Sequence, residues 1–185
     1  MKINKAEDLT KVRKEAMALL SPDTTRITVG ASTCGMARGA AKLIEALKQE
    51  IKKQKVKADV VAVGCNGMCF AEPIVEVIKA GKPRIAYGNV TLDKAADIVK
   101  TVTTGKAIDD MVIAKFDDYE QAGCEETIKY SKTKSADKKD YKKLDFFKNQ
   151  MKIVSRNAGT IDPTSIEEYI ALGGYGALAK ALADT

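Results

Sequence analysis

The sequence predicts an α/β protein with a mixed four-stranded sheet and flanking helices. From residue 26 to residue 105 the apolar patterns follow the order strand, helix, strand, strand, strand, helix. A helix separates the first two strands, which implies parallel pairing, whereas only a short turn separates the next two, which implies an antiparallel hairpin. Both kinds of pairing in one short stretch indicate a mixed sheet.

The first half of the chain contains the elements of the parallel pair. Apolar residues at helical spacing over 4–19 predict an N-terminal helix. A β-branched run at 26–32 predicts the first strand, and residues 34–55 continue with apolar positions at helical spacing. The run VKADVVAVG, residues 56–64, is almost continuously apolar, which favours a second strand buried on both faces of the sheet.

The hairpin and a closing helix follow. Residues 74–89, IVEVIKAGKPRIAYGN, predict two strands around a turn that contains Gly81 and Pro83. The next apolar stripe has helical spacing, with Thr91 as the expected N-cap and Gly105 as the residue that ends the helix. We therefore expect residues 1–105 to form one domain.

Residues 106–185 differ in composition from the first domain. Residues 106–145 begin with a short apolar patch and become rich in lysine, serine and acidic residues, which predicts a charged linker. Residues 146–185 predict two short helices, SIEEYIAL and GALAKALA, with Asp162 or Thr164 as the cap of the first. Such helices cannot enclose a core alone. We expect aromatic residues to anchor this segment on a neighbouring domain, namely Phe146, Phe147, Tyr169 and Tyr175.

Composition narrows the classes of function. The 185 residues include no histidine, which excludes histidine-based hydrolase triads and zinc sites with imidazole ligands on this chain. No apolar run has the length of a membrane span, and the N-terminus is unlike a signal peptide, so we expect a cytoplasmic protein. Much of the net charge of +6 lies in residues 129–152, where acidic residues are interleaved with the lysines. This pattern favours a solvated connector, so we expect no nucleic-acid partner.

Three of the four cysteines follow predicted strands. Cys34 lies on the loop after the first strand, and Cys65 and Cys69 lie on the loop after the second. Because parallel strands end at the same edge of a sheet, both loops are expected where such sheets bind ligands. Metal ligands, a redox pair and buried thiols all remain open as readings. A redox pair is the less favoured because such pairs are usually C-x-x-C at a helix N-terminus.

The residues around these cysteines carry a resemblance. RITVGASTCGMARGA, residues 26–40, and VGCNGMCFAEP, residues 63–73, resemble the thioredoxin-like [2Fe-2S] ferredoxin domain, whose cluster is held by C-x4-C on the first loop and C-x3-C on the second. The resemblance implies a thioredoxin-like fold with Cys34, Cys65 and Cys69 as cluster ligands. The small residues of both loops would let backbone amides hydrogen-bond the cluster.

The fourth ligand departs from the pattern of that family. Val29 stands five residues before Cys34, at the position of the family's other first-loop cysteine, and valine cannot bind iron. Ser32, Thr33, an external ligand or Cys124 are candidates to complete the cluster. The alternative is a cluster-free thioredoxin-like domain that docks subunits.

A second resemblance covers the C-terminal part. FFKNQMKIVSRNAGTIDPTSIEEYIALGGYGALAKAL, residues 146–182, is similar to the segment that leads into the flavin domain of the NADH-binding flavoprotein subunit of complex I, NAD-linked hydrogenases and formate dehydrogenases. In hydrogenase-type members a thioredoxin-like domain precedes this segment. The resemblance implies the N-terminal part of such a subunit, relaying electrons through a [2Fe-2S] cluster within a redox complex.

The same resemblance sets the expected partners and cofactors. Those relatives continue into an FMN- and NADH-binding region, whereas this chain stops at Thr185. We therefore expect FMN and NAD only in the remainder that is missing here, and no complete active site or catalytic residue on this chain. The expected partners are the other subunits of the complex and a flavin domain on the same or a separate chain.

Overall fold

The computed structural model describes residues 5–20, 23–119, 127–131 and 139–183. Its centre is a five-stranded sheet with the strand order β2-β1-β3-β4-β5, and β6 and β7 form a separate two-stranded ribbon. The helices are α1 (Ala6–Leu20), α2 (Thr33–Ala37), α3 (Ala40–Gln54), α4 (Ala95–Thr104), α5 (Asp145–Lys148), α6 (Ile166–Ala171) and α7 (Gly176–Ala183). The strands are β1 (Thr25–Gly30), β2 (Ala58–Val63), β3 (Val75–Ile78), β4 (Arg84–Tyr87), β5 (Val112–Phe116), β6 (Asp118–Tyr119) and β7 (Ile128–Lys129).

The strand pairings confirm the predicted mixed sheet. β1 runs parallel to β2, with Gly30 opposite Val63 at the end of the pair, and antiparallel to β3. β3 and β4 form the predicted hairpin. β2 is an edge strand with several partly exposed residues, so the prediction that it is buried on both faces is wrong. Ala58 and Val60 are only partly buried against the core beneath α3 and α4, whereas Val63 at the end of the strand is buried.

The fifth strand comes from the part of the chain predicted as a charged linker. β5 pairs antiparallel with β4, and its residues alternate between buried and half-buried. Ala114 and Phe116 are buried in the core on the side of α1, whereas Val112 is buried in the core beneath α3 and α4, because the register of the β4–β5 pair shifts between them. Further along, Tyr130 and Tyr141 are buried in the same core. The described part of residues 106–145 is therefore packed on the domain.

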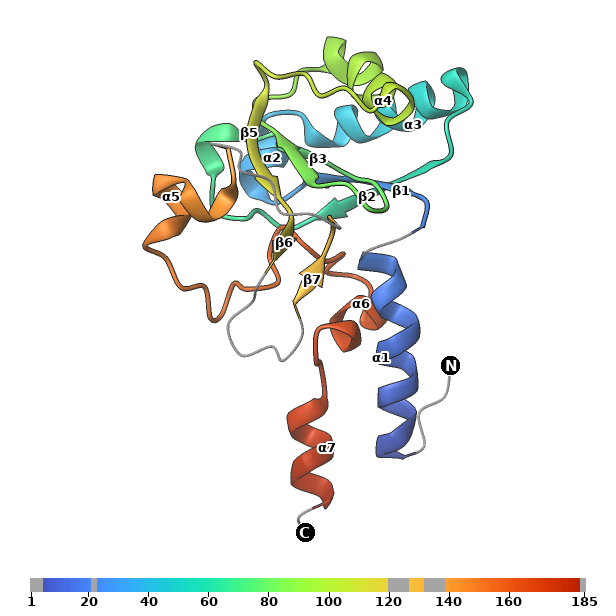
Figure 1. The fold of residues 1–185 in the computed structure, drawn as a ribbon, viewed down its shortest axis with the longest axis vertical. Coiled ribbons are helices and arrows are strands. Elements are labelled where there is room, and N and C mark those ends of the chain that lie inside the picture. Colours follow the sequence, from blue (N-terminus) through green and yellow to red (C-terminus); the bar gives the residue numbers. More distant parts are fainter. Residues whose placement is uncertain (1–4, 21–22, 120–126, 132–138, 184–185) are drawn as a thin grey trace.

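Two apolar cores cover the two faces of the sheet. On one face α3 and α4 pack against β-strand residues such as Ile27 and Val29. On the other, α1 and the C-terminal segment pack against residues such as Ile74 and Phe116. Figure 1 shows α3 and α4 together on one side of the sheet and α1 beside α6 on the other. The layers have the helix-on-sheet arrangement expected of an α/β domain.

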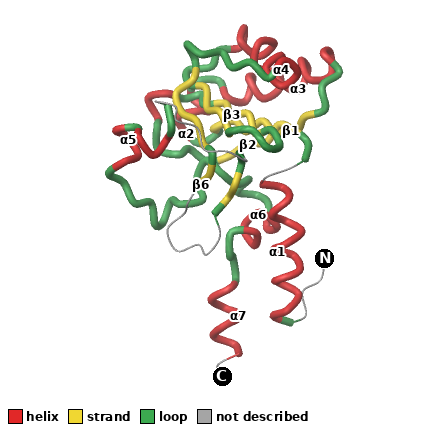
Figure 2. The backbone as a smooth tube through the Cα atoms, viewed as in Figure 1, coloured by secondary structure: helices red, strands yellow, loops and turns green. Residues whose placement is uncertain are grey.

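The C-terminal segment is held by a buried ion pair. Arg26 of β1 binds both carboxylate oxygens of Glu168 in α6 at 2.8 Å, and it donates to the carbonyl of Leu19 at the end of α1. Ser165 caps α6 by accepting from the Glu168 amide, so the prediction of Asp162 or Thr164 as the cap is wrong. A long loop connects α5 to α6 (Figure 2). α7 extends away from the sheet and is largely exposed (Figure 1).

Within the described residues, no helix combines the length and the apolar character needed to cross a bilayer. Cys124, a candidate ligand in the sequence, lies outside the described residues.

Candidate metal centre at the cysteine loops

The two cysteine loops leave the same edge of the sheet. β1 and β2 are parallel and end together at Gly30 and Val63, as the sequence predicts. The Ala31 amide donates to the Val63 carbonyl at 2.9 Å, and the Cys65 amide donates to Ser32 Oγ at 2.9 Å. These hydrogen bonds join the first loop to the second directly behind the cysteines.

The three predicted thiols are brought together. Cys65 Sγ and Cys69 Sγ lie 3.8 Å apart, and a hydrogen bond with Cys69 is the main cause that raises the pKa of Cys34. Two thiolates that each lie ~2.3 Å from one tetrahedral metal are separated by roughly 3.8 Å. The Cys65–Cys69 pair therefore has the spacing of two ligands on one metal. Cys69 is exposed, and Cys34 and Cys65 are half-buried.

The environment of Cys65 favours its protonated form. Burial is the main cause that raises the pKa of Cys65 to about 12, and a hydrogen bond with the Glu72 side chain and the negative charge of Glu72 contribute in the same direction. The Gly67 amide, which donates to Cys65 Sγ at 3.3 Å, acts in the opposite direction. Because metal ions bind thiolates, loading of this site must release protons.

Glu72 is a buried carboxylate that the sequence analysis missed. It is 1% exposed, and its Oε2 accepts a hydrogen bond from the Ile74 amide at 2.8 Å. Its Oε1 is buried, with no hydrogen-bond partner among the described residues. A side chain at Gly30 would collide with this carboxylate, since a Cβ there would lie 2.4 Å from Oε2. Glycine at position 30 thus creates the space that Glu72 occupies.

Val29 cannot take part in a site on the cysteine loops. Its side chain is 0% exposed and packs in the core between the sheet and α3 and α4. Since side chains alternate along a strand, the next position, Gly30, faces the loops instead. Among the described residues, no three histidine, cysteine or acidic side chains are grouped as ligands of one metal ion. A [2Fe-2S] cluster instead takes pairs of ligands on two irons.

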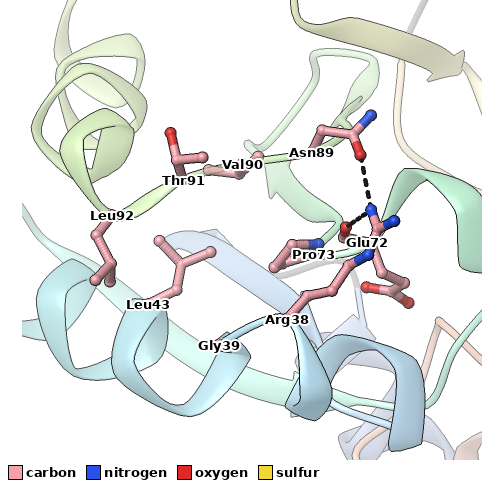
Figure 3. Close-up of a pocket in the computed structure, with 9 residues that line it drawn as sticks. All are labelled: Arg38, Gly39, Leu43, Glu72, Pro73, Asn89, Val90, Thr91 and Leu92. Atoms are coloured by element: carbon pink, nitrogen blue, oxygen red, sulfur yellow. Dashed lines mark hydrogen bonds between the residues drawn. The ribbon is translucent and has the colours of Figure 1, made fainter.

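Arg38 fastens the second loop from the side of α3. Its Nη1 donates to the Glu72 carbonyl at 3.0 Å and to Asn89 Oδ1 at 3.1 Å, and Figure 3 shows both bonds. The same nitrogen lies 3.4 Å from the Phe70 carbonyl. Arg38 also lines an open cavity of about 510 Å³ beside the cysteine loops. The guanidinium therefore holds the backbone carbonyls on both sides of Ala71.

The C-terminal segment contacts the second cysteine loop. The Phe146 ring packs edge-on against Phe70 with 5.9 Å between ring centroids, and Lys152 Nζ donates to the Asn66 carbonyl. Burial lowers the pKa of Lys152, and the nearby Cys65 acts in the opposite direction. Phe146 was expected to anchor the segment on a neighbouring domain, and in the structure it packs on the cysteine loop of its own chain.

Comparison with known proteins finds similarity to two hydrogenase subunits. No family model matches the chain. The NADP-reducing hydrogenase subunit HndB of Solidesulfovibrio fructosivorans is 27% identical over 119 residues, which are 62% of this chain and 94% of that subunit. Subunit HndC of the same organism is 58% identical over 38 residues, 20% of this chain and 8% of HndC. The chain is similar to two hydrogenase subunits. These matches confirm the resemblance predicted from the sequence.

Solved structures similar to the chain include two of a thioredoxin-like [2Fe-2S] ferredoxin from Aquifex aeolicus. Both have a TM-score of 0.43 and 20% identity, and both matches cover 50% of this chain. They cover 93% and 99% of the ferredoxin chains.

Proposed function

We propose that this chain is an electron-transfer module of a multi-subunit oxidoreductase and that Cys34, Cys65 and Cys69 bind a [2Fe-2S] cluster. The observation that carries the proposal is the meeting of these three thiols at one edge of the sheet, with Cys65 and Cys69 3.8 Å apart. The similarity to HndB and HndC supports a place in a hydrogenase-type complex. More specifically, we propose that the chain is the N-terminal part of an NADH-binding flavoprotein subunit.

The residues of the proposed site have different roles. When bound, the cluster supplies reversible one-electron transfer, with a reduced flavin as donor and an iron–sulfur centre of a partner subunit as acceptor. The three cysteines supply thiolates, and the Gly67 amide hydrogen-bonds the Cys65 sulfur. Ser32 and Arg38 hold the loops in register. Cys69 and Phe70 are exposed, which supports a proposed site that a partner can approach.

The C-terminal segment has a separate part in the proposal. Residues 146–185, which follow the domain of residues 1–105 and the segment 106–145, would lead to a flavin domain on the same or a separate chain. FMN and NAD belong to that flavin domain and have no proposed site on these residues. Support comes from the placement of Phe146 and Lys152 against the second cysteine loop, which puts this segment beside the proposed relay.

One observation favours a second candidate, a cluster-free docking domain. Val29 lies in the core at the family's ligand position, so only three of the expected four cysteines are in place. A docking domain needs a folded surface and no metal. Iron content therefore separates the two candidates.

The test is iron and acid-labile sulfide per chain after anaerobic purification, with absorption and reduced-state EPR spectra. We expect about two irons and two sulfides per chain with a [2Fe-2S] spectrum. C34S, C65S and C69S should each lose most of this iron, whereas C124S should retain it. A folded wild-type chain that stays free of iron after reconstitution would overturn the relay and support the docking domain.

A further inference from the structure

A cluster on the cysteine loops lacks one cysteine, and the deficit lies on the first loop. Cys65 and Cys69 form a pair with the spacing of two ligands on one metal. Cys34 is then the single cysteine left for a second iron. The position that faces the loops beside it is Gly30, which has no side chain, because Val29 points into the opposite core.

The Glu72 carboxylate fills the space that a side chain at position 30 would take. A Cβ built on Gly30 would lie 2.4 Å and 2.5 Å from its two oxygens, and a Cβ on Gly35 would lie 3.2 Å from Oε2. The carboxylate is thus packed against the backbone on both sides of the first loop. Its charge also acts on the Cys34 and Cys65 thiols, since it contributes to raising the pKa of both.

From this placement we infer that the Glu72 carboxylate is the fourth ligand of the cluster, an inference that rests on the proposed function. Oε1 is the available donor atom, because it is buried and accepts no hydrogen bond from a nitrogen or hydroxyl group among the described residues. The carboxylate is also close to a cluster thiol, since a hydrogen bond with Glu72 helps to raise the pKa of Cys65. Oε2 keeps the Ile74 amide, which fixes the carboxylate in place. Cys34 and Glu72 would bind one iron, and Cys65 and Cys69 the other.

The charge balance of the interior supports this assignment. In the described part of the chain, no lysine or arginine nitrogen lies within 4.0 Å of the Glu72 carboxylate, although the group is 1% exposed. Buried charges in proteins are paired or coordinate metals, since an isolated one is strongly unfavourable. Glu76, the other buried glutamate nearby, already has both kinds of partner, Arg84 and the Thr28 hydroxyl. Both glutamates have a buried Oε1 without a hydrogen-bond partner among the described residues, but only the charge of Glu76 is paired with an arginine.

Among the described residues, the two hydroxyl candidates for the fourth ligand are less well placed. Ser32 Oγ already accepts a hydrogen bond from the Cys65 amide, which orients it toward the backbone of the second loop. Thr33 is exposed at the start of α2. A neutral hydroxyl would in addition leave the Glu72 charge uncompensated. Binding of Glu72 to iron would both compensate the buried charge of the carboxylate and supply the missing ligand of the first loop.

The test is the Mössbauer spectrum of the full chain, purified anaerobically and loaded with ⁵⁷Fe, compared between wild type and variants. We expect two inequivalent ferric sites in the wild type, because an oxygen ligand makes one iron differ from the other. E72Q keeps the size of the side chain and should lose or shift the signal of the oxygen-bound iron. V29C is the matched control: its thiol would face the α3–α4 core, so its spectrum should equal that of the wild type.

A double variant tests the inference by replacement. G30C combined with E72A exchanges the carboxylate for a thiol at the position that faces the loops, and it should give two similar, all-thiolate iron sites. Circular dichroism checks that each variant is folded, and E72Q alone is decisive if the double variant does not fold. A wild-type chain without a cluster would overturn both this inference and the proposed function. An E72Q cluster identical to that of the wild type, or a V29C spectrum of four thiolates, would overturn the inference alone.

Discussion

The ion pair between Arg26 and Glu168 is predicted to hold the C-terminal segment on the domain. The two side chains are each 6% exposed, and the guanidinium meets both carboxylate oxygens at 2.8 Å. Glu168 also accepts a hydrogen bond from the Asp162 amide at 2.8 Å. E168A would remove all three bonds and leave the Arg26 charge buried, with the Leu19 carbonyl as its partner. The variant should therefore unfold at a much lower denaturant concentration.

The expected loss is large on the scale of domain stability. Removal of one partner from a buried ion pair costs about 3–5 kcal/mol. With a urea dependence of about 2 kcal/mol per molar, this loss lowers the unfolding midpoint by about 2 M. Urea unfolding followed by circular dichroism measures the shift. E167A, an exposed glutamate on the same helix, is the control and should change stability by less than ~0.5 kcal/mol.

A double variant tests the same ion pair. R26M combined with E168L replaces the pair by apolar side chains and should restore most of the loss, because the desolvated charges are both gone. An E168A midpoint within ~0.5 M of the wild type, about 1 kcal/mol, would refute the buried pair. It would mean that α6 does not dock on β1 in solution.

Three further predictions concern the cysteine loops. In the metal-free chain, iodoacetamide should modify Cys65 more slowly than Cys69 at neutral pH, because the raised pKa of about 12 leaves few Cys65 thiolates. The modification rate of Cys65 should rise with pH, and in E72Q this rise should begin at a lower pH. Peptide mass spectrometry measures both rates. R38A should speed amide exchange around Ala71, since it removes hydrogen bonds worth about 1 kcal/mol each. K152M should lower the cluster's reduction potential by roughly 40 mV, about 1 kcal/mol, in a redox titration, while the exposed K48M should not.

The meeting of the cysteines was predictable because it depends on one topological rule. A helix between two strands implies parallel pairing, and parallel pairing brings the loops after β1 and β2 to one edge of the sheet. The hairpin was equally local, since its turn lies between its two strands. Such features follow from residues that are close in sequence.

Glu72 was not predictable because its role depends on a distant glycine. Nothing in the local sequence AEP shows that Gly30, on another strand, leaves room for a carboxylate. The fifth strand was missed for a related reason: the charged residues that follow β5 conceal aromatic residues, such as Tyr130 and Tyr141, that are buried. Ser165 was missed as the cap of α6 because Asp162 and Thr164 are equally suitable residue types nearby, and only the backbone decides between them.

Two of the attachments of the C-terminal segment have different consequences for the proposed metal site. One is the pair of Arg26 and Glu168, at the end of β1 that lies away from the cysteines. The other is the Gly159 carbonyl, which accepts from Arg84 at 2.7 Å, while Gly159 packs against Asn66 in the second cysteine loop. Breaking the first attachment should therefore lower stability without changing the iron bound per folded chain. If E168A instead lost iron while still folded, α6 and the cysteine loops would act as one cooperative unit.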